Sequence, residues 1–196
     1  MKKIIVIVDY GLGNIRSAEQ SFKKVVKDNL INAQVTISNN PNDIKHASHI
    51  VLPGQGSFEA CMNGLKSING MKKKLYEEVV INKKLFLGIC VGMQLLANKS
   101  YENGTHKGLG WIDGEIKKIP HKNLKLPHVG WNKVLSRTPL NRLIKGTEDK
   151  DYYFVHSYYF DSFDKKHEVG VTNYGINFAS IVGKENIYGV QFHPEK

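Results

Sequence analysis

Short apolar runs alternate with amphipathic stretches through the first half of the chain. The apolar runs predict strands, and the stretches in which apolar residues recur every three to four positions predict helices. Strands are expected over 4–9, 34–38, 49–52 and 85–89, and helices over 15–27, 71–81 and 93–98. Because strands separated by helices usually pack in parallel, this half indicates a parallel sheet flanked by helices.

The pattern changes from about residue 108, where the segments become shorter and alternate between apolar and polar positions, with Gly, Asn and Pro between them. Such segments are typical of antiparallel strands. No repeat or linker separates the two halves. We therefore predict an α/β fold with a central, mostly parallel sheet flanked by helices, an antiparallel β-rich second half, and a single domain spanning 1–196.

The composition is that of an ordinary globular protein. With 196 residues, of which 41% are hydrophobic and 23% charged, the chain can build one substantial core. The first apolar run ends at Asp9 without a cleavage site, and no stretch approaches the roughly 18 apolar residues of a membrane span. Cys61 and Cys90 are the only cysteines, too few for a disulfide framework. We expect a cytoplasmic protein without membrane contact.

The formal charge of +10 raises the question of nucleic-acid binding. The excess is almost all lysine in short scattered runs, which is typical of a solvated surface. The chain has no zinc-ligand spacing, RNP-like aromatic motif or basic helix. Neither a nucleic-acid partner nor a metal or other cofactor is expected.

The most informative segment is the end of the strand predicted over 85–89. Cys90 follows it directly, with Gly88 two residues before and Gly92 two residues after. This spacing predicts a tight strand-to-helix turn that presents the cysteine as a nucleophile, with the free N–H of Val91 available to an oxyanion. A lone cysteine after an apolar strand is more often inert and buried. The flanking glycines and Gln94 favour the catalytic interpretation, whereas Cys61 lacks such a setting.

A base for this thiol is offered near the end of the chain. His193 ends a predicted strand, and Glu195 follows it across Pro194. An imidazole can face the thiol with one nitrogen while a carboxylate orients the other. A His-Pro-Glu segment alone would be weak evidence, and its value comes from its combination with Cys90.

These two segments together resemble the paired signature of the class I glutamine amidotransferases. Further segments, at 9–14, 52–58, 127–132 and 153–158, are similar to the glutaminase subunits of imidazole glycerol phosphate synthases, and the resemblance covers nearly the whole chain. It implies hydrolysis of L-glutamine to glutamate and ammonia, with Cys90 as nucleophile, His193 as proton carrier and Glu195 as its orienting group.

The resemblance also implies roles for other positions. The oxyanion of the reacting amide would be held by backbone N–H groups at Gly54, Gln55, Gly56 and Val91. The amino-acid end of glutamine would be held by Gln94, Glu102 and the backbone near Ser157 and Tyr158. A plain turn is the alternative interpretation for the Pro-Gly pair at 53–54.

The family joins this subunit to a (βα)₈-barrel cyclase in a heterodimer, and the ammonia passes through the barrel to make imidazole glycerol phosphate and AICAR from PRFAR in histidine biosynthesis. By resemblance the partner interface includes Asn14, Trp131, Tyr153 and Lys196, although Trp131 could equally be a core aromatic. The chain departs from the family pattern at its end, because relatives commonly continue past Lys196 into a closing helix. Val91 and Gln55 also replace the usual residues, but both positions act through their backbone.

Three other functions share parts of this sequence pattern. A dinucleotide-binding protein is disfavoured because Arg16 stands where the third glycine after Gly11 and Gly13 is needed, and 38–40 lacks an acid. A cysteine-elbow hydrolase or stress sensor would leave Gln94 and the His-Pro-Glu segment as coincidences. A paralogous glutaminase that supplies ammonia to a sugar-amidating enzyme shares the same machinery and stays open.

Overall fold

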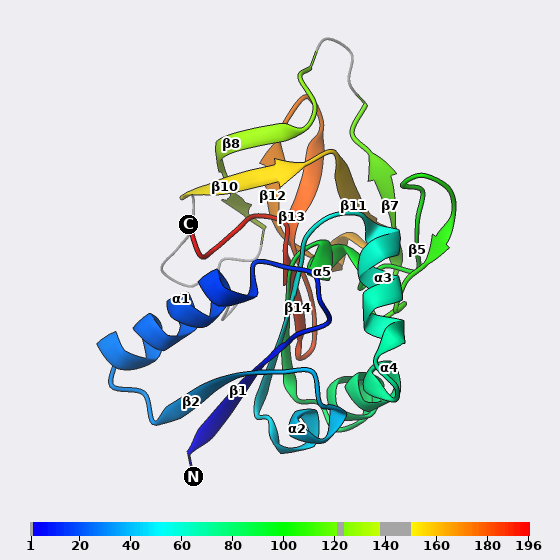
Figure 1. Cartoon of the computed structure of the whole chain (residues 1–196). Helices are drawn as coiled ribbons and strands as arrows, with labels where there is room; N and C mark the ends of the chain where they lie inside the picture. The colour runs from blue at the N-terminus through cyan, green and yellow to red at the C-terminus, as the bar shows by residue number, and fades with distance from the viewer. Residues whose placement is uncertain (1, 121–123, 138–149) are drawn as a thin grey trace.

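A computed structural model describes residues 2–120, 124–137 and 150–196 of the chain (Figure 1). Its main sheet follows the order β2-β1-β3-β4-β14-β13-β11-β7-β5-β6, with β12 also paired to β13 and β9 paired to β12. The strands are β1 (Lys3–Val8), β2 (Ala33–Ser38), β3 (His49–Gly54), β4 (Leu85–Cys90), β5 (Lys99–Ser100), β6 (His106–Lys107), β7 (Gly114–Lys118), β8 (His128–Lys133), β9 (Leu135–Ser136), β10 (Asp151–His156), β11 (Tyr158–Ser162), β12 (Glu168–Asn173), β13 (Asn177–Lys184) and β14 (Ile187–Val190).

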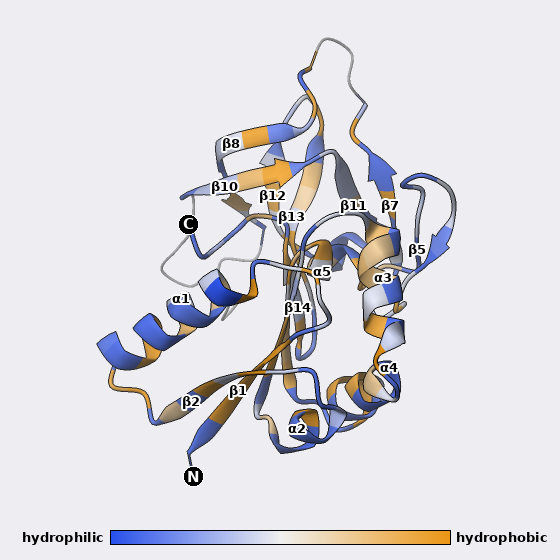
Figure 2. Cartoon of the chain, viewed as in Figure 1, coloured by the Kyte–Doolittle hydropathy of each residue, from blue (hydrophilic) through white to orange (hydrophobic). Residues whose placement is uncertain are grey.

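The first half of the chain forms the predicted parallel layer. β1 pairs in parallel with β2 and β3, and β3 pairs in parallel with β4. Helix α1 (Ile15–Asp28) lies on one side of these strands, and α3 (Phe58–Ser67) and α4 (Met71–Leu75) lie on the other (Figure 1). Apolar residues are concentrated in the central strands, whereas α1 carries polar residues over much of its surface (Figure 2). The predicted α/β fold with a mostly parallel sheet and added antiparallel strands is confirmed.

The second half is largely antiparallel, as predicted. β11 pairs with β7 and β13, and β13 pairs with β12 and β14, all antiparallel. β8 and β10 form a separate antiparallel pair, called here the β8/β10 ribbon. The last strand, β14, returns to the first half and pairs in parallel with β4. On the basis of this shared sheet we propose that 1–196 form one domain.

Two helix predictions need correction. The helix expected over 71–81 is α4 followed by a π-helical segment, Tyr76–Ile81. The helix expected over 93–98 is wrong, because α5 spans only Val91–Gln94. The carbonyls of residues 95–97, which a longer helix would use, instead accept N–H groups from residues 109–112. A tertiary loop therefore replaces the next helical turn.

Helices α2 (Pro41–His46) and α3 were not predicted. Both begin with a side-chain cap, since the Asn40 side chain accepts from the Asn42 N–H and the Ser57 side chain accepts from the Ala60 N–H. Asn and Ser are favoured at this position because they satisfy the free amides of the first turn. These two capping residues were the sequence signal that could have predicted the helices. No helix in the described part of the chain is long and apolar enough to span a membrane.

The turn from β4 into α5 is possible only because of its glycines. A Cβ on Gly92 would lie 1.8 Å from the Leu52 carbonyl oxygen, and one on Gly88 would lie 2.5 Å from the Gly92 carbonyl oxygen. Both distances are far below van der Waals contact, so the backbones of β3, β4 and α5 pack without room for a methyl group. The two glycines are therefore required by close packing.

We expect Gly92→Ala to lower the free energy of unfolding by about 3 kcal/mol or more, because overpacking against rigid backbone is costly. Urea denaturation measures the change. Gly70→Ala is the control, since Gly70 has a φ of +80° and open space around its Cβ position. It isolates the backbone cost of about 1–2 kcal/mol for a left-handed residue. Equal losses in the two variants would contradict the steric argument.

Candidate active site

Cys90 lies where β4 gives way to α5, and its backbone is strained. Its φ is 55° and its ψ is −116°, a region that residues with a Cβ rarely adopt. Strain of this kind is kept where surrounding packing dictates it, often at functional positions. The residue is 6% exposed and is paired in register with Gly54 at the end of β3. The predicted sharp turn is present.

His193 reaches the same place from the end of the chain. Its backbone N–H donates to the Tyr153 carbonyl at 2.9 Å, which ties it to β10. Its Nδ1 lies 2.9 Å from Glu195 Oε1, and Asn14 Nδ2 donates to the same oxygen at 3.4 Å. Because Nδ1 is engaged by the carboxylate, Nε2 is the nitrogen left for the Cys90 sulfur.

The electrostatics of this group favour an imidazolium. The pKa of His193 is raised to about 10, first by the adjacent Cys90 sulfur and then by Glu195, against the opposing effect of burial. Burial alone would raise the pKa of Glu195, but His193, backbone groups and Asn14 together hold it below its usual range. A charged imidazole beside the sulfur stabilises negative charge there. Cys90, His193 and Glu195 are thus brought together.

A cleft of about 370 Å³ opens over these groups. Its lining consists of Asn14, Gln55, Gly56, Cys90, Val91, Tyr153, Val155, His193 and Lys196. Three of the four predicted oxyanion residues line it, and the fourth, Gly54, lies against the elbow, because a Cβ there would be 2.6 Å from the Gly92 nitrogen. The geometry can therefore bring backbone amides to a carbonyl attacked by Cys90.

Two side chains hydrogen-bond to backbone carbonyls at the end of β3 and in the loop that follows it. The Tyr10 hydroxyl donates to the Pro53 carbonyl at 2.7 Å, and the Cys61 thiol donates to the Gln55 carbonyl at 3.4 Å. Burial raises the pKa of both Tyr10 and Cys61, so both stay protonated donors at neutral pH. Cys61 is therefore engaged in shaping the loop, a role that sequence analysis did not assign. Gly56 has a φ of +93°, which glycine adopts without strain.

Gln94 is buried, and its amide group is oriented by its partners. Its Nε2 donates to the Tyr158 carbonyl at 3.2 Å and to Gln191 Oε1 at 3.0 Å. Gln191 in turn donates from Nε2 toward the Cys90 sulfur at 3.8 Å. Both amide hydrogens of Gln94 are used inside the protein, so its Oε1 can only accept from another group.

Gln191 was missed in the sequence. It is fully buried, although glutamine is mostly exposed in proteins. A glutamine between the apolar residues Val190 and Phe192, two positions before His193, was the signal that could have found it.

The remaining predicted substrate residues lie near Gln94. Glu102 Oε2 accepts the Phe58 N–H at 2.6 Å at the start of α3. Burial and then the charge of Glu102 raise the pKa of Tyr158, which indicates that Glu102 and Tyr158 are neighbours. Ser157 precedes Tyr158, and its carbonyl accepts from Ile119. These residues form a group beside the cleft and are not part of its lining.

The predicted interface residues surround the mouth of the cleft. Asn14, Tyr153 and Lys196 line it. Trp131 is 63% exposed and lies opposite Tyr153 in the ribbon, with ring centroids 5.8 Å apart. The alternative that Trp131 is a core aromatic is wrong. Beside this pair, Val129 and Val155 are also exposed and opposite each other. These four residues, Val129, Trp131, Tyr153 and Val155, form the outer face of the ribbon.

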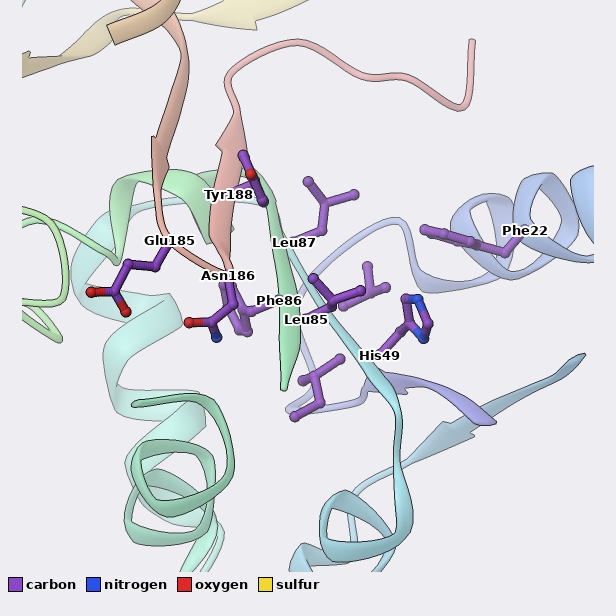
Figure 3. Close-up of a pocket in the computed structure, with 10 residues that line it drawn as sticks. Phe22, His49, Leu85, Phe86, Leu87, Glu185, Asn186 and Tyr188 are labelled. Atoms are coloured by element: carbon purple, nitrogen blue, oxygen red, sulfur yellow. The ribbon is translucent and has the colours of Figure 1, made fainter. Parts of the chain in front are cut away.

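A larger cavity of about 620 Å³ lies elsewhere, on the sheet face near Phe22 of α1 (Figure 3). It is lined mainly by apolar residues from the beginning of β3 and β4, such as Ile50, Leu85 and Phe86. Ligand sites in parallel α/β sheets lie at the carboxyl ends of the strands, where Cys90 is, so this cavity is not the candidate site. Among the described residues no group of three or more His, Cys, Asp or Glu could hold a metal ion.

We expect His193 to stabilise the fold in a pH-dependent way. Its pKa in the folded protein, about 10, lies above its ordinary value of 6.5. The folded state therefore retains the proton, and the stabilisation is fully present below about pH 6.5 and is lost as the pH rises toward 10.

The difference in unfolding free energy between the natural chain and His193→Gln should thus shrink from pH 6 to pH 10 in urea titrations. The exposed His46→Gln is the control. A difference that stayed constant or grew with pH would contradict the assigned ion pair.

Comparisons with known proteins agree with this geometry. A family model for glutamine amidotransferase class-I matches residues 6–196. The imidazole glycerol phosphate synthase subunit HisH of Pelagibacter ubique (strain HTCC1062) is 47% identical over 195 residues, covering 98% of this chain and 92% of that protein. The same subunit of Rhodospirillum rubrum is 40% identical, with 98% and 91% covered.

Solved structures show the same fold. A crystal structure of a glutamine amidotransferase matches with a TM-score of 0.70 at 15% identity, covering 97% of this chain and 90% of that one. A glutamine amidotransferase from Thermotoga maritima matches with a TM-score of 0.67 at 18% identity, covering 100% and 77%. With a family match over nearly its full length and relatives of this similarity, the chain belongs to the class I glutamine amidotransferase family.

Proposed function

We propose that the protein is the glutaminase subunit of an imidazole glycerol phosphate synthase. It hydrolyses L-glutamine to glutamate and ammonia, and a (βα)₈-barrel cyclase partner consumes the ammonia in histidine biosynthesis. The observation that carries the proposal is the convergence of Cys90 and His193 at one cleft, with Nδ1 of the histidine 2.9 Å from the Glu195 carboxylate. The relatives named as HisH support the choice of pathway.

The chemistry follows from these groups. The Cys90 sulfur attacks the side-chain amide carbon of glutamine, a C–S bond forms, and the oxygen takes the negative charge beside the backbone amides of the elbow and the loop. When the C–N bond breaks, the His193 imidazolium gives its proton to the leaving nitrogen, and ammonia departs. Water then loses a proton to His193 and attacks the thioester, which releases glutamate and the thiol. Glu195 keeps the imidazole oriented throughout.

Recognition of the amino-acid end of glutamine is assigned to the group around Gln94. Because both of its amide hydrogens are used inside the protein, Gln94 can offer only Oε1, which suits an ammonium donor. The Glu102 carboxylate, a neighbour of Tyr158, supplies negative charge that would also attract the ammonium group. A carboxylate needs hydrogen-bond donors, and the Tyr158 carbonyl is an acceptor that two donors already use, so contact with the substrate carboxylate falls to the N–H groups near Ser157 and Tyr158.

The outer face of the ribbon is the proposed docking surface for the cyclase. It is apolar and exposed, with Trp131 at 63% and Val129 at 55%, and it continues into the cleft through Tyr153 and Val155. Exposed aromatic residues of this kind are common anchors of protein interfaces. A cyclase seated here would receive ammonia directly from the cleft without loss to water.

A paralogous glutaminase that supplies a sugar-amidating enzyme is the second candidate, since its machinery would be the same. The names of the relatives favour the histidine pathway. We propose the cytoplasm as the location, in keeping with a biosynthetic role and two free, buried cysteines.

Replacing the nucleophile tests the enzyme assignment. In the complex with the cyclase, we expect Cys90→Ala to reduce glutamine-dependent synthesis by at least about a thousandfold, as loss of a nucleophile does in other enzymes. Synthesis driven by added ammonium should stay within about twofold, because it bypasses thioester formation. Steady-state assays with each nitrogen source measure both rates. Loss of both activities would mean that Cys90 serves folding or assembly instead.

Trp131→Ala tests the docking surface. We expect the affinity for the cyclase, measured by titration calorimetry, to fall by about 30-fold or more, the loss typical of an interface anchor. The free energy of unfolding should change by no more than about 0.5 kcal/mol, because the side chain is exposed. Val25→Ala, at an exposed apolar position of α1, is the matched control. Unchanged affinity would place the interface elsewhere.

A further inference from the structure

The inner face of the β8/β10 ribbon holds two buried histidines that the proposed mechanism does not use. His128 and His156 are directly opposed in the ribbon, and both are buried. His128 Nδ1 lies 3.0 Å from His156 Nε2, and His156 Nδ1 lies 2.8 Å from the Tyr158 carbonyl oxygen. At the other end, Asn132 Nδ2 lies 3.2 Å from His128 Nε2. Four groups thus form one continuous chain of hydrogen bonds.

The positions of the protons in this chain follow from its ends. A carbonyl oxygen can only accept, so His156 must carry a proton on Nδ1, and Nε2 of a neutral imidazole then accepts. His128 must therefore donate from Nδ1, which leaves its own Nε2 as the acceptor for the Asn132 amide. Asn132 Nδ2 also donates to the Asn173 carbonyl, and its Oδ1 accepts the Lys133 N–H. Every donor in the chain therefore faces an acceptor, and the donors run in one direction, from Asn132 to the Tyr158 carbonyl.

This arrangement requires both imidazoles to be neutral. A proton added to His156 Nε2 would face the Nδ1–H of His128, and a proton added to His128 Nε2 would face the Asn132 amide. The surroundings agree, because Tyr174 stacks on His128 with ring centroids 4.0 Å apart and Phe178 lies edge-on to His156 at 5.0 Å. Burial among these rings lowers the pKa of both histidines, that of His156 to about 3.

The chain leads into the candidate active site. The Tyr158 carbonyl accepts from His156 and also from Gln94, so both of its lone pairs are used. Gln94 donates its second hydrogen to Gln191, which donates toward the Cys90 sulfur. The orientation of the Gln94 amide therefore depends on a carbonyl that His156 holds in place.

We propose that His156, supported by His128, is a positioning residue for glutamine binding. It fixes the Tyr158 carbonyl, and through it the Gln94 amide, so that Gln94 Oε1 and the N–H groups beside Tyr158 face the amino-acid end of the substrate. The inference rests on the proposed glutaminase function. Neither histidine touches the substrate or the reacting atoms; both act through the Tyr158 backbone.

Two substitutions of His156 by amide residues test whether a donor at the position of Nδ1 is needed, or whether any polar side chain is enough. In His156→Asn the side-chain amide reaches about as far as Nδ1 and can still donate to the Tyr158 carbonyl. In His156→Gln the amide reaches about as far as Nε2, and that donor is lost. In the cyclase complex we expect the KM for glutamine to rise at least about tenfold in His156→Gln, equivalent to one lost hydrogen bond. In His156→Asn it should stay within about threefold.

The turnover number and the ammonium-driven rate separate this role from a purely structural one. Both should stay within about threefold in the two variants, because the nucleophile and its base are unchanged. His46→Gln, on the exposed end of α2, is the matched control for loss of an imidazole. Equal KM values in the two His156 variants, whether raised or unchanged, would overturn the proposal. An inactive natural complex would instead refute the glutaminase assignment.

The tautomers of the natural chain give a test that needs no variant. In ¹⁵N-histidine NMR spectra between pH 5.5 and 8, we expect His128 and His156 to stay neutral with the proton on Nδ1. If both His156 variants fail to fold, this measurement on the natural chain still tests the proposal. A proton on Nε2 of either residue, or protonation of either within that range, would break the chain of donors and overturn the proposal.

Discussion

The parallel pairing of β4 with β14 is the interaction on which the rest of the site depends. The register aligns Val190 with Ile89, so that the two strands end side by side. Cys90 follows immediately on one strand, and His193 follows three residues later on the other. A shift of this register by one residue would turn the side chains of β14 to the opposite faces of the sheet. Cys90 and His193 are about a hundred residues apart in the sequence, and the pairing of β4 with β14 brings them together.

Close backbone packing makes the site rigid at the point of attack. β3, β4 and α5 meet where Gly54, Gly88 and Gly92 leave no space for a methyl group. This crowding holds Cys90 in its strained conformation and sets the loop after β3 directly against the elbow. Tyr10 and Cys61 complete the arrangement by fixing the carbonyls of Pro53 and Gln55. The backbone groups proposed to hold the oxyanion are therefore ordered by packing and by these two hydrogen bonds.

How much of this could be predicted depends on whether the determinants are local. The elbow at Cys90 and the His-Pro-Glu segment are visible because glycine spacing and strand ends are properties of short segments. The length of α5 was mispredicted because residues 109–112, which lie outside the segment whose pattern predicted the helix, take the carbonyls of 95–97. Gln191 was overlooked for the same reason, since its partner Cys90 is 101 residues away. The direction of the Gln94 amide is likewise decided by contacts that no local pattern encodes.

The two faces of the ribbon are linked by the alternation of side chains along a strand. His128 and Asn132 point inward from β8, and Val129 and Trp131 point outward. A slip of β8 by one residue would bury Trp131 and expose His128, and an apolar outer face alone could not prevent it. The bond between the opposed His128 and His156 exists only in the observed register. Because unpaired buried polar groups are costly, the inner hydrogen bonds penalise every other pairing. The polar interior of the ribbon therefore keeps its apolar residues on the surface, beside the cleft where a partner would dock.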